Sequence, residues 1–309
     1  TEDEAVACFA SYSGLDTAGA HADAIKQIVT RLGSIPLAIS MAALYFRNAA
    51  GTVEELSAEY FAELDALEDI GSIPPGFDRT AFAAVEHAVH NLGVGMVGDD
   101  RHDVRMVQAM LYRASLLAPD MIPLNYLIAS MPESLVMRLE QLPEPAFGDA
   151  AACRRYISII RTQSIAHRVV IPGADGEQNE ASDTFNVHPL VHEILRRLFV
   201  REIPPIRLVG QLTMMLYFLN GWLIHARKHN QYFVVDQLAA HALSLLNFID
   251  SLGELPTPGE AETKMFRFLK LGLKLEVSTC RMSRGDVNAS VNLAREALLE
   301  AWSYPPDPL

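Results

Sequence analysis

Cysteine is scarce in this chain, and its few copies are too far apart to act together. The 309 residues include three cysteines, Cys8, Cys153 and Cys280. The number is odd, and no two of them stand in a CxxC spacing. A disulfide framework and a zinc knuckle are both excluded, because each needs cysteines in pairs or at ligand spacing. Free thiols are typical of reducing compartments, so we expect a cytoplasmic protein.

A phosphate-binding loop is also missing. No segment fits GxxxxGK[ST], and the glycine-rich stretch at residues 93–100 has no lysine to meet a phosphate. We therefore predict no catalytic residue, and this chain alone should not hydrolyse ATP. His188 and His192 have the spacing of a helical zinc pair, but Pro189 stands where HExxH needs glutamate. No metal site is predicted.

Positive charge is in deficit. The chain has 25 Lys and Arg against 38 Asp and Glu, a formal net charge of -13. Nucleic acids and anionic lipids both favour basic surfaces, so we expect neither a nucleic acid nor a membrane as partner. Residues 208–226 carry no charge and are roughly long enough to cross a bilayer. They include Gln211, Thr213 and Asn220, and we interpret them as a buried helix.

The chain opens without methionine and without a signal peptide. The first residue is Thr1, and the residues after it do not include the basic segment and apolar run of a signal peptide. We therefore expect the sequence to be part of a longer protein.

Apolar residues recur at helical spacing over most of the chain. Half of the residues are hydrophobic, enough to build real cores. Thr1 and Glu4 form a possible capping box, and Pro36 suits the first turn of a helix over residues 36–48. That segment is apolar nearly all round, which predicts a buried helix. The predicted class is mainly α. Further helices are expected at about residues 17–32, 52–67, 79–92, 102–117, 149–163, 206–227, 231–252, 260–282 and 287–301.

The helical spacing of apolar residues is interrupted once, near the middle of the chain. Residues 165–171 and 184–187 are rich in β-formers and are separated by a polar, turn-rich stretch, which predicts a β-hairpin. His188 and Pro189 follow it directly and open a helix with an apolar stripe. Helices, a two-stranded wing and a closing helix together predict a winged-helix domain.

Two short motifs, in this order, resemble those of the NB-ARC class of signal-transduction ATPases. Residues 28–39 contain Ser34-Ile35-Pro36-Leu37, which looks like the GLPL motif of that family. Residues 185–191, with His188 at the centre, resemble the MHD motif that ends the family's winged helix. Ser34 replaces the first glycine of the former motif, and Pro189 replaces the aspartate of the latter. The helices around residues 284–286 are similar to a tetratricopeptide unit.

This resemblance implies a domain plan and two ligand-binding residues. It divides the chain into a helical subdomain at residues 1–70, a winged helix at 71–201, a helical linker at 202–259 and a first repeat-like hairpin at 260–309. In the family, the residue matching Pro36 packs on the adenine of ATP or ADP, and the residue matching His188 contacts the β-phosphate. Magnesium would be held by a nucleotide-binding domain upstream of Thr1.

The sequence thus predicts the regulatory part of an ATP/ADP-dependent signalling switch. Its partners would be its own upstream nucleotide-binding domain and a protein ligand of the repeat-like helices, and activation could involve homo-oligomers. The full-length protein would be a slow ATPase. One alternative is a helical scaffold without nucleotide binding. Another is a winged-helix DNA-binding regulator, for which Arg196, Arg197 and Arg201 supply positive charge.

Overall fold

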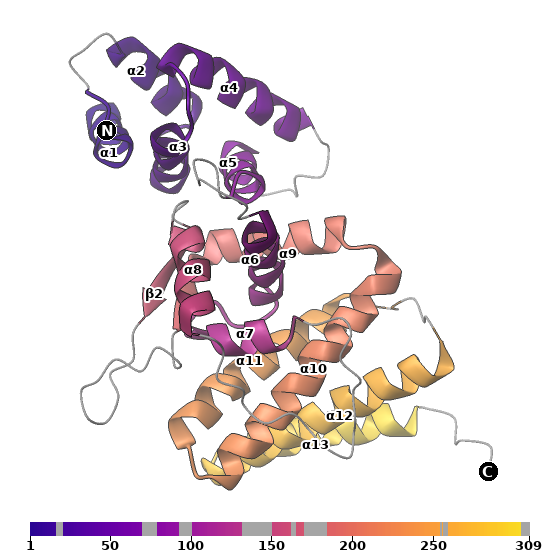
Figure 1. Cartoon of the computed structure of the whole chain (residues 1–309). Helices are drawn as coiled ribbons and strands as arrows, with labels where there is room; N and C mark the ends of the chain where they lie inside the picture. The colour runs from indigo at the N-terminus through magenta and orange to yellow at the C-terminus, as the bar shows by residue number, and fades with distance from the viewer. Residues whose placement is uncertain are drawn as a thin grey trace. The chain divides into compact units, whose positions relative to one another are not determined.

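A computed structural model describes most of the chain and is mainly α-helical (Figure 1). The described residues are 1–16, 21–69, 79–92, 101–131, 150–161, 165–169, 184–253, 255 and 259–303. They form thirteen helices and three short strands, which confirms the predicted fold class. They divide into two compact units. Unit 1 comprises Thr1–Leu111, Ala150–Arg168 and Asn186–Leu198, and unit 2 comprises Tyr112–Asp149, Val169–Phe185 and Phe199–Leu309.

The first helix of unit 1 begins and ends where its capping residues predict. The side chain of Thr1 accepts a hydrogen bond from the N–H of Glu4, whose carboxylate reaches back to the N-terminus, so the capping box is confirmed. Gly14 ends this helix in the left-handed conformation, at φ 76°. Unit 1 contains α1 (Glu2–Ser13), α2 (Ala22–Arg31), α3 (Pro36–Asn48), α4 (Val53–Asp69), α5 (Arg79–His90), α8 (Ala150–Arg161) and most of α6 (Arg101–Ala114) and α9 (Pro189–Glu202).

Helix α3 is the centre of the unit 1 core. It packs against α1 and α5, and eight of its thirteen residues are buried. Because apolar residues surround α3, it can be covered on several sides at once, as the sequence predicts. Phe9 of α1 and Phe46 of α3 meet edge to face with ring centroids 5.6 Å apart. The boundary predicted near residue 70 lies outside the described residues.

The three strands form one small antiparallel sheet in the order β1-β3-β2. The predicted hairpin is confirmed as β2 (Ala166–Val169) beside β3 (Thr184–Val187). Strand β1 (Ile122–Pro123) was not predicted; Ile122 pairs with Phe185 and Pro123 with Thr184. Two residues give no alternating pattern, and proline is normally a sign against a strand. It is tolerated here because β1 is an edge strand, where a missing N–H costs no ladder bond.

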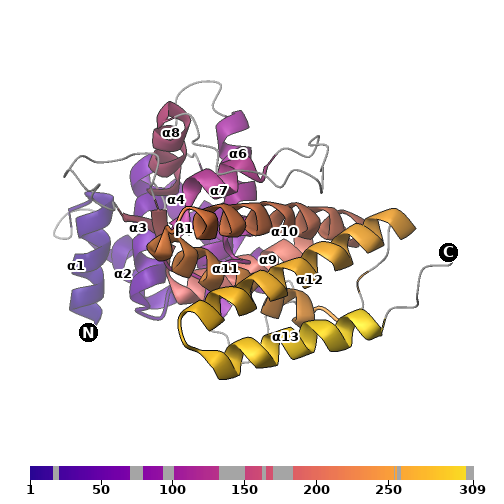
Figure 2. The same ribbon diagram turned by 90° about the horizontal axis from the view of Figure 1, so that it is seen from below.

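Unit 2 is built on four long helices. They are α10 (Pro205–Lys228), α11 (Tyr232–Ser251), α12 (Glu260–Ser283) and α13 (Val287–Trp302), with the short α7 (Leu124–Ala129) also in this unit. Helix α12 packs against each of the other three long helices, and α12 and α13 form a hairpin whose arms lie side by side in Figure 2. The uncharged stretch at 208–226 lies within α10, where most of its apolar side chains are buried.

One described helix, α11, has the length and apolar composition to cross a membrane, and 44% of its most apolar stretch is buried. The core helices of globular proteins meet the same criteria.

Helix α13 differs from the prediction in which side chains it buries. The helical spacing of Val291, Leu293, Ala294, Ala297 and Leu298 predicts that they pack, but Val291 and Leu298 are 52% and 54% exposed. Ala297, whose packing the same spacing predicts, is buried, and so is Ser290. The helix has a described neighbour on one side, so half of its apolar positions stay in solvent. Trp302, at 79%, is the most exposed of them.

Candidate functional site

Pro36 lies at the first turn of α3, directly after a tight loop. It occupies the first helical position, where its missing N–H leaves no hydrogen bond unmade, and it is exposed. Gly33 and Ser34 precede it with φ angles of 62° and 56°. Two consecutive left-handed residues turn the chain sharply between α2 and α3. The loop presents the proline ring on the surface of unit 1, free to contact another molecule.

Ser34→Gly is expected to stabilise the chain, because Ser34 holds a left-handed backbone that glycine adopts without strain. The gain should be about 1 kcal/mol or slightly less, since the greater freedom of glycine in the unfolded chain offsets part of it. Urea unfolding gives the measurement. Gly33→Ala is the matched control and should destabilise, although its new methyl would meet nothing nearer than 3.9 Å. Equal stability of the Ser34→Gly variant and the parent chain would contradict this reasoning.

His188 stands between β3 and α9, with its ring held by the backbone. Its Nδ1 accepts a hydrogen bond from the N–H of Leu190 at 3.2 Å. This bond satisfies one of the free N–H groups at the start of α9. It also fixes the tautomer, because an accepting Nδ1 leaves the ring proton on Nε2. The residue is exposed. His188 therefore offers an oriented N–H donor at the surface of unit 1.

The neighbouring polar residues of α9 are already engaged. His192 is buried, at 6% exposure. Glu193 lies 2.9 Å from a guanidinium nitrogen of Arg197 and 3.9 Å from one of Arg196. Arg201 pairs with Glu202. Carboxylates thus compensate the positive charge that the DNA-binding alternative needs, which weakens that alternative.

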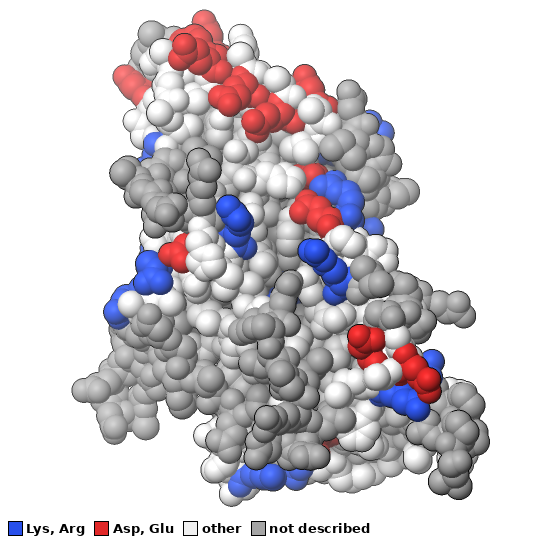
Figure 3. All heavy atoms as spheres, turned by 45° about the vertical axis from the view of Figure 1, so that its right-hand side comes forward, with Lys and Arg blue, Asp and Glu red and all other residues white. Residues whose placement is uncertain are grey.

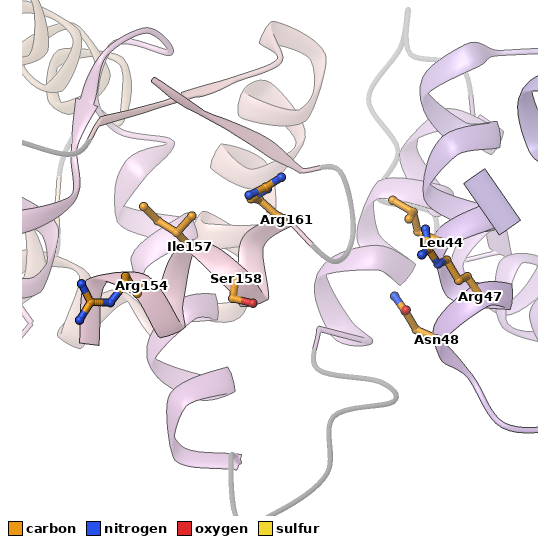
Figure 4. Close-up of a pocket in the computed structure, with 7 residues that line it drawn as sticks. All are labelled: Leu44, Arg47, Asn48, Arg154, Ile157, Ser158 and Arg161. Carbon is orange, nitrogen blue, oxygen red and sulfur yellow. The ribbon is translucent and has the colours of Figure 1, made fainter. Parts of the chain in front are cut away.

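Residues of two helices of unit 1 line an open cavity of about 430 Å³ that the sequence did not predict. Figure 4 shows the side chains from α3 on one side and those from α8 on the other. Helix α8 contributes residues at i, i+3, i+4 and i+7, which is one helical face. The lining residues are Leu44, Arg47 and Asn48 of α3 and Arg154, Ile157, Ser158 and Arg161 of α8.

A second cavity, of about 310 Å³, lies beside a buried histidine between α4 and α5. His87 is 2% exposed, and its Nε2 is 2.8 Å from a carboxylate oxygen of Glu63. The rings of Tyr45 and Tyr60 meet the imidazole edge-on, with centroids 4.7 and 4.5 Å away. Burial, and to a lesser extent His90, lowers the pKa of His87 to about 4. The histidine is therefore neutral at physiological pH.

The two cavities are lined by neither Pro36 nor His188. The cavity lined by Arg47, Arg154 and Arg161 is called the arginine cavity below. It could not be predicted from the sequence, because Arg47 and Arg154 are more than a hundred residues apart. The face formed by Arg154, Ser158 and Arg161 was readable from spacing alone, but such a polar stripe is normally solvated. The cavity beside His87 could not be predicted from the sequence either, since a single histidine on a helix is most simply interpreted as a packed residue.

Comparison with known proteins gives no match: no protein family, no curated protein and no solved structure matches this chain.

Proposed function

We propose that this chain is the regulatory part of an ATP/ADP-dependent switch, closing over a nucleotide that an upstream domain binds. The observation that carries the proposal is the ring of His188. Its Nδ1 accepts a hydrogen bond from the backbone of α9, which leaves the ring proton on Nε2, and the residue is exposed. A phosphate oxygen accepts such a donor in a charge-assisted hydrogen bond. The resemblance to the MHD motif implies the same contact for this residue.

Two further features support the proposal. Ser34 has a left-handed backbone at the position where the GLPL motif has glycine, so this loop has the shape for which glycine is suited. The second feature is the element order α6, β1, α7, α8, β2, β3, which is the order of a winged helix. Strand β1, unexpected from the sequence, supplies the third strand of that arrangement.

The switch would work through a difference in affinity. A nucleotide shifts a protein between two conformations only as far as it binds one of them more tightly. Contacts from Pro36 and His188 to bound ADP would favour the closed form. Exchange for ATP would release them, and the repeat-like helices of unit 2 would then respond to a protein partner or to further copies of the chain. The cytoplasm supplies both nucleotides.

The first experiment is to read the coding sequence upstream of Thr1 and to search it for GxxxxGK[ST] between a strand and a helix. The protein with its upstream region is then purified, and the ADP that it retains is quantified. His188→Ala is expected to weaken ADP binding by about 10- to 100-fold, which corresponds to one hydrogen bond to a charged group.

His167→Ala is the control for this experiment, because His167 is an exposed histidine on β2 of the same unit. It should leave ADP retention unchanged. His188→Asn separates the two roles of the ring, since asparagine still caps a helix but does not place a donor at the same point. Unchanged ADP binding in both His188 variants would refute the switch.

A protein-binding helical scaffold is the second candidate, and the exposed apolar residues of the last hairpin favour it. Helix α12 exposes Phe268, Leu275 and Met282 at intervals of seven residues, and α13 exposes five large apolar side chains. Such spacing forms an apolar stripe along one face of the helix, on which a helix of another protein can pack. An upstream region without a phosphate-binding loop would favour the scaffold over the switch.

A further inference from the structure

The arginine cavity of unit 1 is lined by positive charge, whereas the chain as a whole is acidic. Acidic side chains outnumber basic ones overall, and they gather over α4 of the same unit (Figure 3). Yet the described residues that line the cavity include Arg47, Arg154 and Arg161 and no carboxylate. A local excess of positive charge in an acidic protein raises the local concentration of anions.

Two of these charges lack a carboxylate partner among the described residues. Arg47 and Arg161 have no ion-pair partner in the part of the chain that the structure describes. Arg155, the residue after Arg154 on α8, does not line the cavity, and its guanidinium pairs with Asp103 at 2.9 Å. Among the described residues, Arg47 and Arg161 thus differ from Arg155, and their guanidinium groups are available to an anion from solution.

The geometry fits a ligand with more than one phosphoryl group. Arg154 and Arg161 are seven residues apart on one face of α8, about 10 Å along the helix. Arg47 approaches from α3, on the opposite side of the cavity (Figure 4). Linked phosphoryl groups give a ligand two charged ends, one for Arg47 of α3 and one for Arg161 of α8. Each guanidinium can hold two oxygens of one group in a planar fork.

The rest of the lining adds a neutral donor and an apolar contact. Ser158 contributes an exposed hydroxyl between the two arginines of α8. Ile157 is 7% exposed and forms an apolar part of the wall together with Leu44. A volume of about 430 Å³ lies in the range of small-molecule sites.

We propose that this cavity binds a small molecule carrying a diphosphate or longer phosphoryl chain. The site is separate from the nucleotide contacts proposed above. Arg47 is eleven residues from Pro36, about 16 Å along α3. The chain would therefore hold a second phosphoryl ligand that bridges α3 and α8 and holds the two helices together.

Calorimetric titration of the 309-residue chain with inorganic pyrophosphate, at fixed ionic strength, tests this site. Arg47→Gln and Arg161→Gln should each weaken binding by about tenfold or more, because each removes one charged fork. The same titration with ADP distinguishes the source of the phosphoryl groups. Tighter binding of ADP would indicate an organic diphosphate, and tighter binding of pyrophosphate the inorganic ion. In both cases the two arginine variants should weaken it.

Two controls make the result specific. Arg105→Gln removes the same charge from an exposed position of α6 outside the cavity. His188→Ala removes the proposed nucleotide contact, so its effect separates the two proposals. Both should leave pyrophosphate affinity unchanged. The proposal is overturned if pyrophosphate does not bind, if sulfate at equal ionic strength binds as well, or if Arg105→Gln weakens binding as much as Arg47→Gln.

Discussion

Replacing Glu300 by glutamine is expected to lower the free energy of unfolding by about 3 kcal/mol, because it leaves two largely buried ammonium groups with one carboxylate. Glu300 of α13 lies 2.7 Å from Lys270 and 2.9 Å from Lys274, both on α12. Asp250 of α11 lies 2.7 Å from Lys270 and 3.5 Å from Lys274. The lysine side chains are 12% and 6% exposed, so water cannot replace the lost carboxylate.

The loss follows from charge balance. Two ammonium groups and two carboxylates form a neutral set that joins three helices of unit 2. Burial lowers the pKa of Lys270, but hydrogen bonds to Asp250 and Glu300 outweigh it and raise the pKa overall. Lys270 thus stays charged. With Glu300 gone, the half-exposed Asp250 faces two positive charges alone.

Urea unfolding followed by circular dichroism measures this effect. Glu296→Gln on the same helix is the matched control, since Glu296 is exposed and outside the network. It should change stability by less than about 0.5 kcal/mol. Adding Lys274→Met to Glu300→Gln removes the uncompensated charge and should recover part of the loss. Equal stability of the Glu300→Gln and Glu296→Gln variants would show that the network contributes nothing.

The second large effect concerns pH. His87 has a pKa of about 4 in the folded chain and about 6.5 when unfolded. Between these values the unfolded chain binds a proton that the folded chain does not, so stability decreases as the pH falls from 6.5 to 4. The difference corresponds to about 3 kcal/mol. Below pH 4 the decrease from this residue ends, since both states are protonated.

His87→Phe should remove this part of the acid sensitivity. A phenyl ring keeps the edge-on contacts to Tyr45 and Tyr60 and has no proton to bind. The measurement is the free energy of unfolding at pH 7, 5.5 and 4, with His102→Gln as a control at an exposed site. The charged or titratable groups that face His87 are Glu63, His90 and the phenols of Tyr45 and Tyr60. If parent and His87→Phe lose equal stability, Glu63 pairs with a protonated His87 in the folded chain and the residue confers no acid sensitivity.

Local chemistry explains how much of the fold was readable from the sequence. The capping box at Thr1, the proline that opens α3 and the glycine that ends α1 act within a few residues of one another, so a single sequence reveals them. The hairpin of β2 and β3 was readable from the change of period, and β1 was not, since two residues carry no period.

Features that depend on partners distant in the chain were not readable. Lys274 looks like an ordinary surface lysine until Asp250 and Glu300 are placed beside it. The exposed Val291 and Leu298 have the same helical spacing as core residues, and periodicity cannot tell an occupied face from an open one. Of the candidate site, the sequence singled out Pro36 and His188 by motif. It could not show that the ring of His188 is anchored to Leu190.

The hairpin of α12 and α13 contains a buried exchange of hydroxyl hydrogen bonds. Ser278 donates to the carbonyl of Ser290 at 2.9 Å, and Ser290 donates to the carbonyl of Ser278 at 2.8 Å. Sliding α13 by one residue along α12 would leave both hydroxyls buried without partners, at about 1–3 kcal/mol each. The pair therefore sets a single axial register between the helices. A molecule that docks on Val291, Leu298 and Trp302 would meet a template of fixed spacing, and its recognition would depend on matching that spacing rather than on moulding a pliable surface.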